Sequence, residues 1–574
     1  MDFTKLPHTA VDFAAWSWDQ IEPYFADLAA RQLTASNARA WLLDWTRLAE
    51  LLDEANWRLY IATTVNTADE DAQRRYAAYI DTIRPKAQQA EQTLKQKLLA
   101  SPAVVPDDFG ISFQKMQWQS EIYRESNLPL LAEEAKLSTE HNKIIGAQTV
   151  MWEGEERTLS QLVPIYQEPD RAVREKAWRL SLARQLQDKD AINEVWVKML
   201  DVRSKIAKNA GMSDYRAYKF KEMLRFDYTP EDCLAFHDAI EEVVVPAAER
   251  VHARRKKRLG LDSVRPWDVM VDPYGRPALK PYQTIDELLS KTSAIFHKVD
   301  PTLGGYFDVM RREGLLDLDN RPNKAPGAYN LPFEAAHRPF IFGNSVGIHD
   351  DVTTLFHEGG HSFHTFETSD KLPYFQQRGE VGIPIEFAEV ASMAMELLAS
   401  PYLPASEGGF YTDEEYARAM IDHLEGIVTF WPYMAILDAY QHWVYTHIDE
   451  AMNPDACDAE WSALWKRFYK GVDWTGLEDG VVMRWRRQPH PFSYPFYYVE
   501  YGLAQLGAVQ VWRNALKDQA GAVAAYRRAL ALGGSKPLPE LFQTAGAKFG
   551  FDADTMHSAI SLLEEQIEKL EARL

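Results

Sequence analysis

The residues best suited to catalysis lie in the segment His357-Glu358-Gly359-Gly360-His361. Residues i and i+4 share one face of a helix, so the imidazoles of His357 and His361 can bind one metal ion. Glu358 follows the first histidine and can take a proton from the water that attacks a substrate. A chance match to H-E-x-x-H in a chain of this length is expected in roughly a few per cent of cases. The pattern therefore needs a third ligand to support it.

The next predicted helix supplies candidates for that ligand. It begins near Pro384 and places Glu386, Glu389 and Glu396 on one face at helical spacing. A catalytic zinc site uses three protein ligands and leaves a fourth position open. A surface helix with solvated glutamates is the alternative, and composition alone favours the two readings about equally.

Helical periodicity dominates the elements that must position these residues. Apolar residues recur at spacings of three and four over residues 37–63, 67–98, 171–211, 230–259 and 504–532. Strand patterns are few: a hairpin over Gln148–Leu159, and a short strand over His337–Asn344 ahead of the motif helix. Asp350 or Asp351 can cap that helix, whose two glycines each cost up to about 1 kcal/mol but leave room beside a metal. We predict a mainly α protein with a small β element beside the H-E-x-x-H helix.

Composition narrows the class of protein. The 574 residues are 46% hydrophobic and 26% charged with a formal net charge of −21, which is typical of a large soluble protein. The negative charge disfavours nucleic acid and anionic membranes as partners, and no apolar run reaches the length of about 18 residues that a membrane span needs. The two cysteines, Cys233 and Cys457, indicate a reducing compartment. Since the N-terminus lacks a secretory signal pattern, we expect a cytoplasmic protein.

The segments HEGGHSFH and EFAEVASMAME together resemble the thimet oligopeptidase and oligoendopeptidase F family of zinc metallopeptidases. The resemblance implies that Glu389 is the third ligand of a single zinc ion. It also implies that Glu386 and Glu396 orient a ligand histidine through its other ring nitrogen, and that His364 lies close to the site.

The resemblance extends over most of the chain from about residue 145, notably over Arg203–Tyr215, Leu315–Tyr329 and Ile341–Glu358. We therefore divide the sequence into an N-terminal helical region, 1–145, and a helical catalytic region, 146–574. The family resemblance implies a two-lobed helical body with the zinc in a deep central channel.

A second unusual cluster is the segment HPFSYPFYYVEY, from His490 to Tyr501. Phenol groups can donate hydrogen bonds to a developing oxyanion, although an aromatic core is the favoured reading for such a run by itself. By resemblance it is the family's substrate-binding and transition-state segment. Its best matches there are His490, Tyr494, Tyr498 and Tyr501, with Tyr497 as a further substrate-binding candidate. Pro491 and Pro495 stand where the thimet branch has glycines, so the chain resembles the oligoendopeptidase F branch more closely.

The resemblance implies a zinc-dependent oligoendopeptidase that hydrolyses internal bonds of short unfolded peptides, with Glu358 as general acid–base. One alternative is a metallocarboxypeptidase or dipeptidyl carboxypeptidase. It would need a cation for the terminal carboxylate, and the candidates are Arg338, Arg484, Arg486 and Arg487. An inactive peptide-binding protein is a second alternative, although all three ligands and Glu358 are present.

A peptide substrate could add as a strand along the edge of His337–Asn344 through main-chain hydrogen bonds. This hypothesis makes Phe342, Gly343 and Asn344 candidate substrate-binding residues. A strand fully paired within the protein is at least as well supported by the sequence. The oligomeric state is not indicated.

Overall fold

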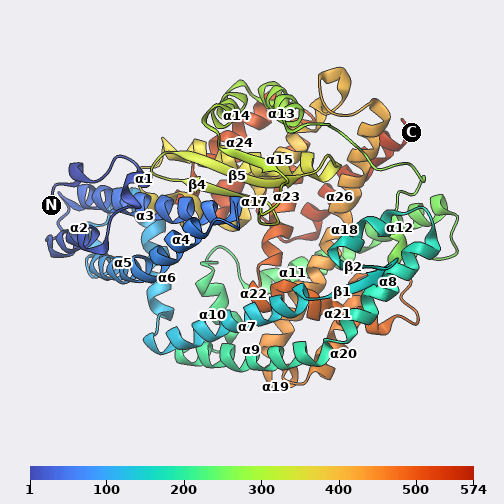
Figure 1. The fold of residues 1–574 in the computed structure, drawn as a ribbon, viewed down its shortest axis with the longest axis horizontal. Coiled ribbons are helices and arrows are strands. Elements are labelled where there is room, and N and C mark those ends of the chain that lie inside the picture. Colours follow the sequence, from blue (N-terminus) through green and yellow to red (C-terminus); the bar gives the residue numbers. More distant parts are fainter. The chain divides into compact units, whose positions relative to one another are not determined.

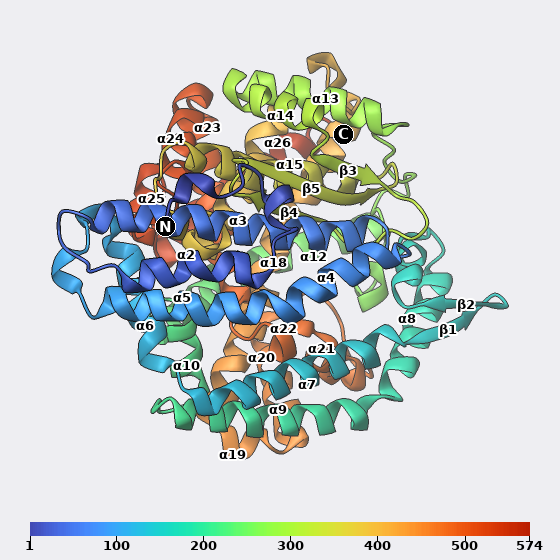
Figure 2. The same ribbon diagram turned by 60° about the vertical axis from the view of Figure 1, so that its left-hand side comes forward.

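The computed structural model describes residues 1–574, except for the side chains of residues 380 and 381. Figure 1 shows the chain coloured from the N-terminus to the C-terminus, and Figure 2 shows the same ribbon turned by 60°. The chain forms two compact units, each built from three separate stretches. Unit 1 contains residues 1–120, 279–419 and 504–549, and unit 2 contains residues 121–278, 420–503 and 550–574. The division of the sequence at residue 145 stays a prediction.

Unit 1 combines helices with a three-stranded sheet. Its helices are α1 (Ala10–Phe13), α2 (Trp18–Ala30), α3 (Ala38–Val65), α4 (Glu70–Thr82), α5 (Arg84–Leu99), α13 (Ile285–Val299), α14 (Pro301–Glu313), α15 (His349–Ser369), α16 (Gly379–Gly382), α17 (Ile385–Ala399), α24 (Gln519–Leu530) and α25 (Leu538–Thr544). Its strands are β3 (Leu316–Asp319), β4 (Tyr329–Phe333) and β5 (Arg338–Ser345).

Unit 2 is helical apart from one hairpin. Its helices are α7 (Leu128–Gly146), α8 (Arg171–Leu186), α9 (Lys189–Asn209), α10 (Tyr215–Glu222), α11 (Pro230–Ala239), α12 (Val245–Leu259), α19 (Ile448–Ala451), α20 (Pro454–Phe468), α21 (Glu478–Arg487), α22 (Pro489–Ser493) and α26 (Ala553–Glu571). Residues of both units belong to α6 (Gly110–Ile122), α18 (Asp413–Thr446) and α23 (Tyr498–Ala515). The hairpin joins β1 (Thr149–Trp152) to β2 (Glu155–Thr158) through Glu153 and Gly154, both with positive φ, which confirms the predicted hairpin.

The predicted helical stretches are helical, and proline explains where two of them break. The pattern over 67–98 divides into α4 and α5, with Pro85 in the first turn of α5. The pattern over 230–259 divides at a π-helical turn, Ile240–Val244, and Pro246 then lies in the first turn of α12. Proline has no N–H to donate to the preceding turn but is tolerated where a helix begins. The mainly α fold with a small sheet beside α15 is confirmed.

β5 is the central strand of the unit 1 sheet. Its partners are β3, which runs parallel, and β4, which runs antiparallel and pairs with Arg338–Phe342. Both neighbours pair with it, but the pairing with β4 ends at Phe342. Arg338–Phe342 therefore offers no open edge on that side, and peptide pairing at Gly343 and Asn344 stays a prediction. Positions 339–343 of β5 are all buried, and α15 packs against this strand.

The side chain of Asp351 accepts hydrogen bonds from main-chain N–H groups in the turn that leads into α15. The Oδ2 atom of Asp351 accepts hydrogen bonds from the N–H groups of Val346, Gly347 and Ile348, at 2.9, 2.8 and 2.9 Å. The hydroxyl of Tyr282 donates to the same oxygen. Of the two predicted capping residues, Asp351 has this role.

The glycines of the H-E-x-x-H segment are explained by close packing. A Cβ on Gly360 would lie 2.4 Å from the carbonyl oxygen of Ala391 and 2.6 Å from Cα of Ser392, both on α17. A Cβ on Gly359 would lie 2.6 Å from the ring of Phe296 on α13. Contact with neighbouring helices, rather than room beside a metal, is therefore the reason for glycine here.

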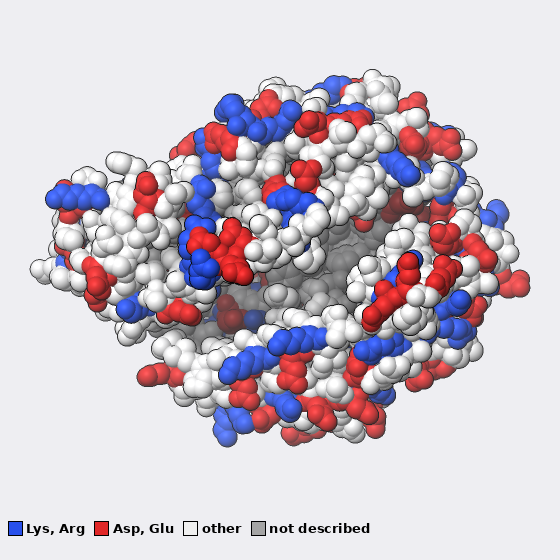
Figure 3. All heavy atoms as spheres, viewed as in Figure 1, with Lys and Arg blue, Asp and Glu red and all other residues white. Residues whose placement is uncertain are grey.

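No helix of the described chain combines the length and the apolar character needed to cross a bilayer. Over the face drawn in Figure 3, acidic and basic side chains are interspersed.

Replacing Gly360 by alanine is expected to destabilise unit 1, because the new methyl group meets rigid main-chain atoms of α17 instead of a movable side chain. The expected cost is about 1–3 kcal/mol, measured as a lower midpoint of thermal unfolding. The matched control is Gly305→Ala on α14, where the added Cβ has no neighbour within 4 Å. That change should be neutral or stabilising, since alanine favours the helix. Equal effects of the two changes would contradict the packing argument.

Candidate metal centre

Three predicted ligands come together between α15 and α17. His357, His361 and Glu389 each present one ligand atom within 4.8 Å of the other two. The Oε2 atom of Glu389 lies 3.4 Å from Nε2 of His357 and 3.8 Å from Nε2 of His361. Two atoms that are each about 2.0–2.1 Å from a tetrahedral zinc ion lie about 3.3–3.4 Å apart. The three side chains can therefore bind zinc after only small adjustments.

Negative charge surrounds His357 on both sides of its ring. Glu396 Oε1 lies 2.7 Å from Nδ1, and Glu389 faces Nε2. Burial opposes a charge on this ring, but hydrogen bonds donated by the ring to both carboxylates raise the pKa of His357 well above its ordinary value. Burial lowers the pKa of His361 to about 4, so this second imidazole is neutral and able to ligate. The field that favours an imidazolium at this position also favours a divalent cation.

Glu358 is the buried carboxyl group next to this centre. Burial raises its pKa to about 7, even though the neighbouring His357 acts in the opposite direction. A carboxyl group that titrates near neutral pH can both accept and return a proton during a reaction. Its main-chain carbonyl accepts a hydrogen bond from the Asn330 amide, 3.2 Å away, and that amide also donates to Ser362. Asn330 thus ties β4 to the turn of α15 that carries Glu358.

A cavity of about 260 Å³ opens beside Glu358. Phe342, Gly343 and Asn344 at the end of β5 are among the residues that line it. The side-chain amide of Asn344 already donates to the carbonyls of Ala325 and Gly327, both at 2.9 Å. The Asn344 amide is therefore already engaged within the protein beside the cavity. Substrate binding by Phe342, Gly343 and Asn344 stays a prediction.

The three residues predicted to surround the ligands differ in what they contact. Glu396 lies where its predicted role requires, with Oε1 2.7 Å from Nδ1 of His357, and that orienting role stays a prediction. His364 is buried with its ring packed edge-on against Phe387, and burial lowers its pKa to about 3. Its ring nitrogens have no side-chain hydrogen-bond partner among the described residues, and its predicted role beside the ligands stays a prediction. Glu386 is buried on the same helix as Glu389, and its orienting role stays a prediction.

Two residues near the centre were not predicted from the sequence. Ser392 donates from Oγ to Oε2 of Glu389 at 3.0 Å and so fixes the carboxylate that faces both histidines. Its position three residues after Glu389 was the available signal, because i and i+3 lie on one face of a helix. Asn330 had no such signal, since its strand meets α15 only in the folded chain.

The predicted histidine and tyrosines form a cluster of their own in unit 2. The ring centroids of His490 and Tyr498 are 4.5 Å apart, and Tyr501 lies 5.9 Å from Tyr498. Tyr497 lies 5.1 Å from Tyr501. Tyr494 is the outlying member, with 60% of its surface exposed. The segment is therefore a surface-facing aromatic cluster and not a fully enclosed core.

Hydrogen bonds define which nitrogen of His490 can donate. The Tyr433 hydroxyl donates to Oε1 of Gln488, so the Gln488 amide faces Nδ1 of His490, 2.8 Å away. Burial lowers the pKa of His490 to about 4, so the ring is neutral at pH 7. Since Nδ1 accepts a hydrogen bond, the proton of the neutral ring lies on Nε2, which is then a hydrogen-bond donor. Gln488 was not predicted from the sequence.

Buried arginines hold the same segment through its main chain. Arg203 donates to the carbonyls of Pro491 and Phe492, at 2.6 and 2.7 Å, and Arg225 donates to the carbonyl of Phe496. These bonds agree with the presence of prolines rather than glycines in the segment, because both features fix the main chain.

The profile of peptidase family M3 matches residues 165–559, and that of the peptidase M3 N-terminal domain matches residues 10–105. With this fold and this metal centre, the chain belongs to peptidase family M3, which confirms the family predicted from the sequence.

Relatives support the same assignment. The chain is 26% identical over 338 residues to oligopeptidase PepF of Bacillus subtilis (strain 168), covering 58% of this chain and 48% of that protein. It is 27% identical over 277 residues to the chromosomal oligoendopeptidase F of Lactococcus lactis subsp. cremoris, covering 45% and 41%. The matches thus span less than half the length of these two relatives. A solved structure of PZ peptidase A with an inhibitor is 25% identical, with a TM-score of 0.84 and 99% of both chains covered.

Replacing Glu396 by glutamine is expected to lower zinc affinity by about 10- to 100-fold, because the neutral amide no longer fixes and polarises His357. Competition with a chromophoric chelator measures the change. The control is Glu407→Gln, an exposed glutamate of unit 1, which should leave the affinity unaltered. If Glu396→Gln bound zinc as tightly as the unmodified chain, the orienting role would be wrong.

Proposed function

We propose that this protein is a zinc-dependent oligoendopeptidase that hydrolyses internal bonds of short unfolded peptides. The observation that carries the proposal is the group formed by His357, His361 and Glu389, with the buried Glu358 carboxyl beside it. Membership of peptidase family M3 supports peptide hydrolysis. The deep central channel implied by the family resemblance would restrict substrates to short peptides, and it stays a prediction.

His357, His361 and Glu389 would hold the zinc ion, and two imidazoles with one carboxylate match the donor set of catalytic zinc sites. When bound, zinc lowers the pKa of water and polarises a carbonyl group. Glu358 accepts the proton of the attacking water and delivers it to the amine that leaves. Ser392 and Glu396 keep the ligands in place through their hydrogen bonds.

The proposal includes the His490 cluster because its segment resembles the family's transition-state segment. By that resemblance, the Nε2–H group of His490 and the hydroxyls of Tyr498 and Tyr501 would donate to the oxyanion of the tetrahedral intermediate. Burial raises the pKa of Tyr498, so its hydroxyl stays protonated and able to donate.

Two of the arginines needed by a carboxypeptidase are already engaged. Arg338 pairs with Glu313 at 2.8 Å, and Arg486 is fully buried against Asp458 and Asn193. These pairs leave Arg484 and Arg487 of the four candidate cations for a terminal carboxylate, which weakens the carboxypeptidase alternative.

Replacing Glu358 by glutamine is expected to leave zinc content unchanged and to abolish hydrolysis, because an amide cannot accept the proton. The assay uses a fluorescence-quenched peptide blocked at both ends, which a carboxypeptidase leaves intact. Addition of a chelator to the unmodified protein should also stop cleavage, and added zinc should restore it. Cleavage by the Glu358→Gln protein at the original rate, or an intact blocked peptide with the unmodified protein, would refute the proposal.

Replacing His490 by alanine is expected to lower kcat by about 10²–10³-fold, the effect of losing one oxyanion donor. Zinc content should not change, since the predicted ligands lie elsewhere. The control is His447→Ala, an exposed histidine of unit 2, which should leave kcat unaltered. An unchanged kcat in His490→Ala would remove His490 from the mechanism.

A further inference from the structure

Two helices of unit 2 each carry a pair of metal-binding residues at the spacing i, i+4. Helix α11 carries Cys233 and His237, and α18 carries Asp438 and His442. Each pair lies on one helical face for the same reason as the histidines of α15. All four residues are buried, with exposures of 0, 1, 0 and 3% in that order. The mechanism proposed above uses none of them.

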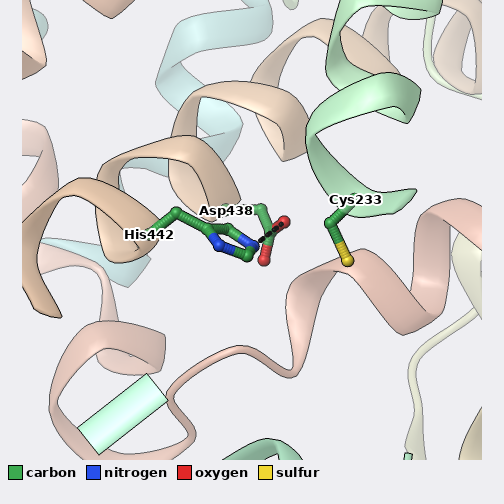
Figure 4. Close-up of side chains that lie close together, drawn as sticks. All are labelled: Cys233, Asp438 and His442. Atoms are coloured by element: carbon green, nitrogen blue, oxygen red, sulfur yellow. Dashed lines mark ion pairs between the residues drawn. The ribbon is translucent and has the colours of Figure 1, made fainter. Parts of the chain in front are cut away.

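The four side chains meet at Asp438. One ligand atom each of Cys233, Asp438 and His442 lies within 4.8 Å of the other two. In Figure 4 the Asp438 carboxylate lies between the ring of His442 and the side chain of Cys233. Its Oδ2 atom is 3.3 Å from Nε2 of His442, so the carboxylate and this imidazole are close enough to share one ion through Oδ1 and Nε2. His237 lies on the other side, with Nε2 2.9 Å from the same oxygen.

Polar atoms of this cluster lack hydrogen-bond partners among the described residues. They are Oδ1 of Asp438, Nδ1 of His237 and Nε2 of His442. Buried polar atoms are nearly always satisfied, and an unsatisfied buried carboxylate oxygen costs more than a neutral group. A cation between Asp438 and His442 would satisfy two of the three atoms.

We propose that Cys233, Asp438 and His442 supply three ligands of a second zinc ion, and that His237 holds the Asp438 carboxylate in place. Thiolate, imidazole and carboxylate together are a donor set that suits zinc. Binding forms a zinc–sulfur bond and releases the thiol proton to solvent. The two charges of the ion are then balanced by the thiolate and the carboxylate, so the buried site carries no net charge. The π-helical turn that follows α11 directly, Ile240–Val244, is a feature often found beside functional sites.

Arg216 is expected to weaken metal binding, because it is positively charged and donates a hydrogen bond to His442. Its guanidinium lies 3.3 Å from Nδ1 of His442. Arginine only donates, so in the metal-free ring the proton lies on Nε2. Zinc at Nε2 moves that proton to Nδ1, and the half-buried Arg216 side chain must then turn away. Removing this guanidinium should therefore strengthen metal binding.

Cobalt substitution of the full-length protein distinguishes this site from the centre on α15. Cobalt bound to a thiolate absorbs in the near ultraviolet through charge transfer from sulfur, whereas cobalt bound by two imidazoles and a carboxylate does not. The unmodified protein is expected to hold two cobalt ions per chain and to show the sulfur band. Cys233→Ser should hold one ion and lose the band, and Cys457→Ser should retain both properties. Cys457 is the matched control because it is also buried but donates to the carbonyl of Ala451, outside any such cluster.

Further variants separate this inference from the proposed function. His361→Gln should lose the ion of α15 and peptide hydrolysis but keep the sulfur band. Arg216→Leu should keep the band and need several-fold more chelator to lose it, which is a gain that misfolding cannot produce. The proposal is overturned if the unmodified protein shows no sulfur band, if the band survives in Cys233→Ser, or if Arg216→Leu releases its second ion more readily than the unmodified protein does.

Discussion

The close approach of α15 and α17 at Gly360 is the constraint on which the metal centre depends. No side chain fits between this residue and the main chain of Ala391 and Ser392. The two helices therefore lie near enough for Glu389 to reach the histidines across the interface, at 3.4 and 3.8 Å. Two glycines in a helix are costly on propensity alone, and burial against α13 and α17 offsets that cost.

Electrostatics then set what each carboxylate can do. Glu389 and Glu396 face opposite sides of His357, and both carry partners that hold them: Ser392 for the first and the imidazole itself for the second. Among the described residues no such partner holds the buried carboxyl group of Glu358, so its pKa rises to about 7 instead of falling. Carboxylates around the same candidate centre thus differ in role because their surroundings differ.

In unit 2 the same i, i+4 spacing of metal-binding residues leads to a different kind of site. Cys233 with His237, and Asp438 with His442, repeat the i, i+4 spacing of His357 and His361, but on two helices that face each other. In this cluster a cysteine sulfur takes the place of one imidazole, and the side chains are more deeply buried than those of His357 and His361. Such surroundings suit an ion that stabilises the fold, since an enclosed site has no route for a substrate.

Much of this protein follows from its sequence, because the relevant signals are local. Periodicity over 37–63 predicts α3, which spans Ala38–Val65. The turn residues Glu153 and Gly154 predict the hairpin, and the aspartates before the motif helix predict its cap. The spacing of His357 and His361 predicts two ligands on one helical face. Family resemblance predicts Glu389 as the third, and the structure brings the three side chains together.

Other features are decided only by contacts between distant segments. The sequence leaves β5 as an edge or a central strand, and only its pairing with both β3 and β4 settles the matter. It cannot separate Glu396, which reaches His357, from a solvated glutamate, nor show that His364 packs into the core. Cys233 and Asp438 are 205 positions apart, and nothing local links them. The spacing along a helix fixes which side chains share a face, but packing of one helix on another decides what that face meets.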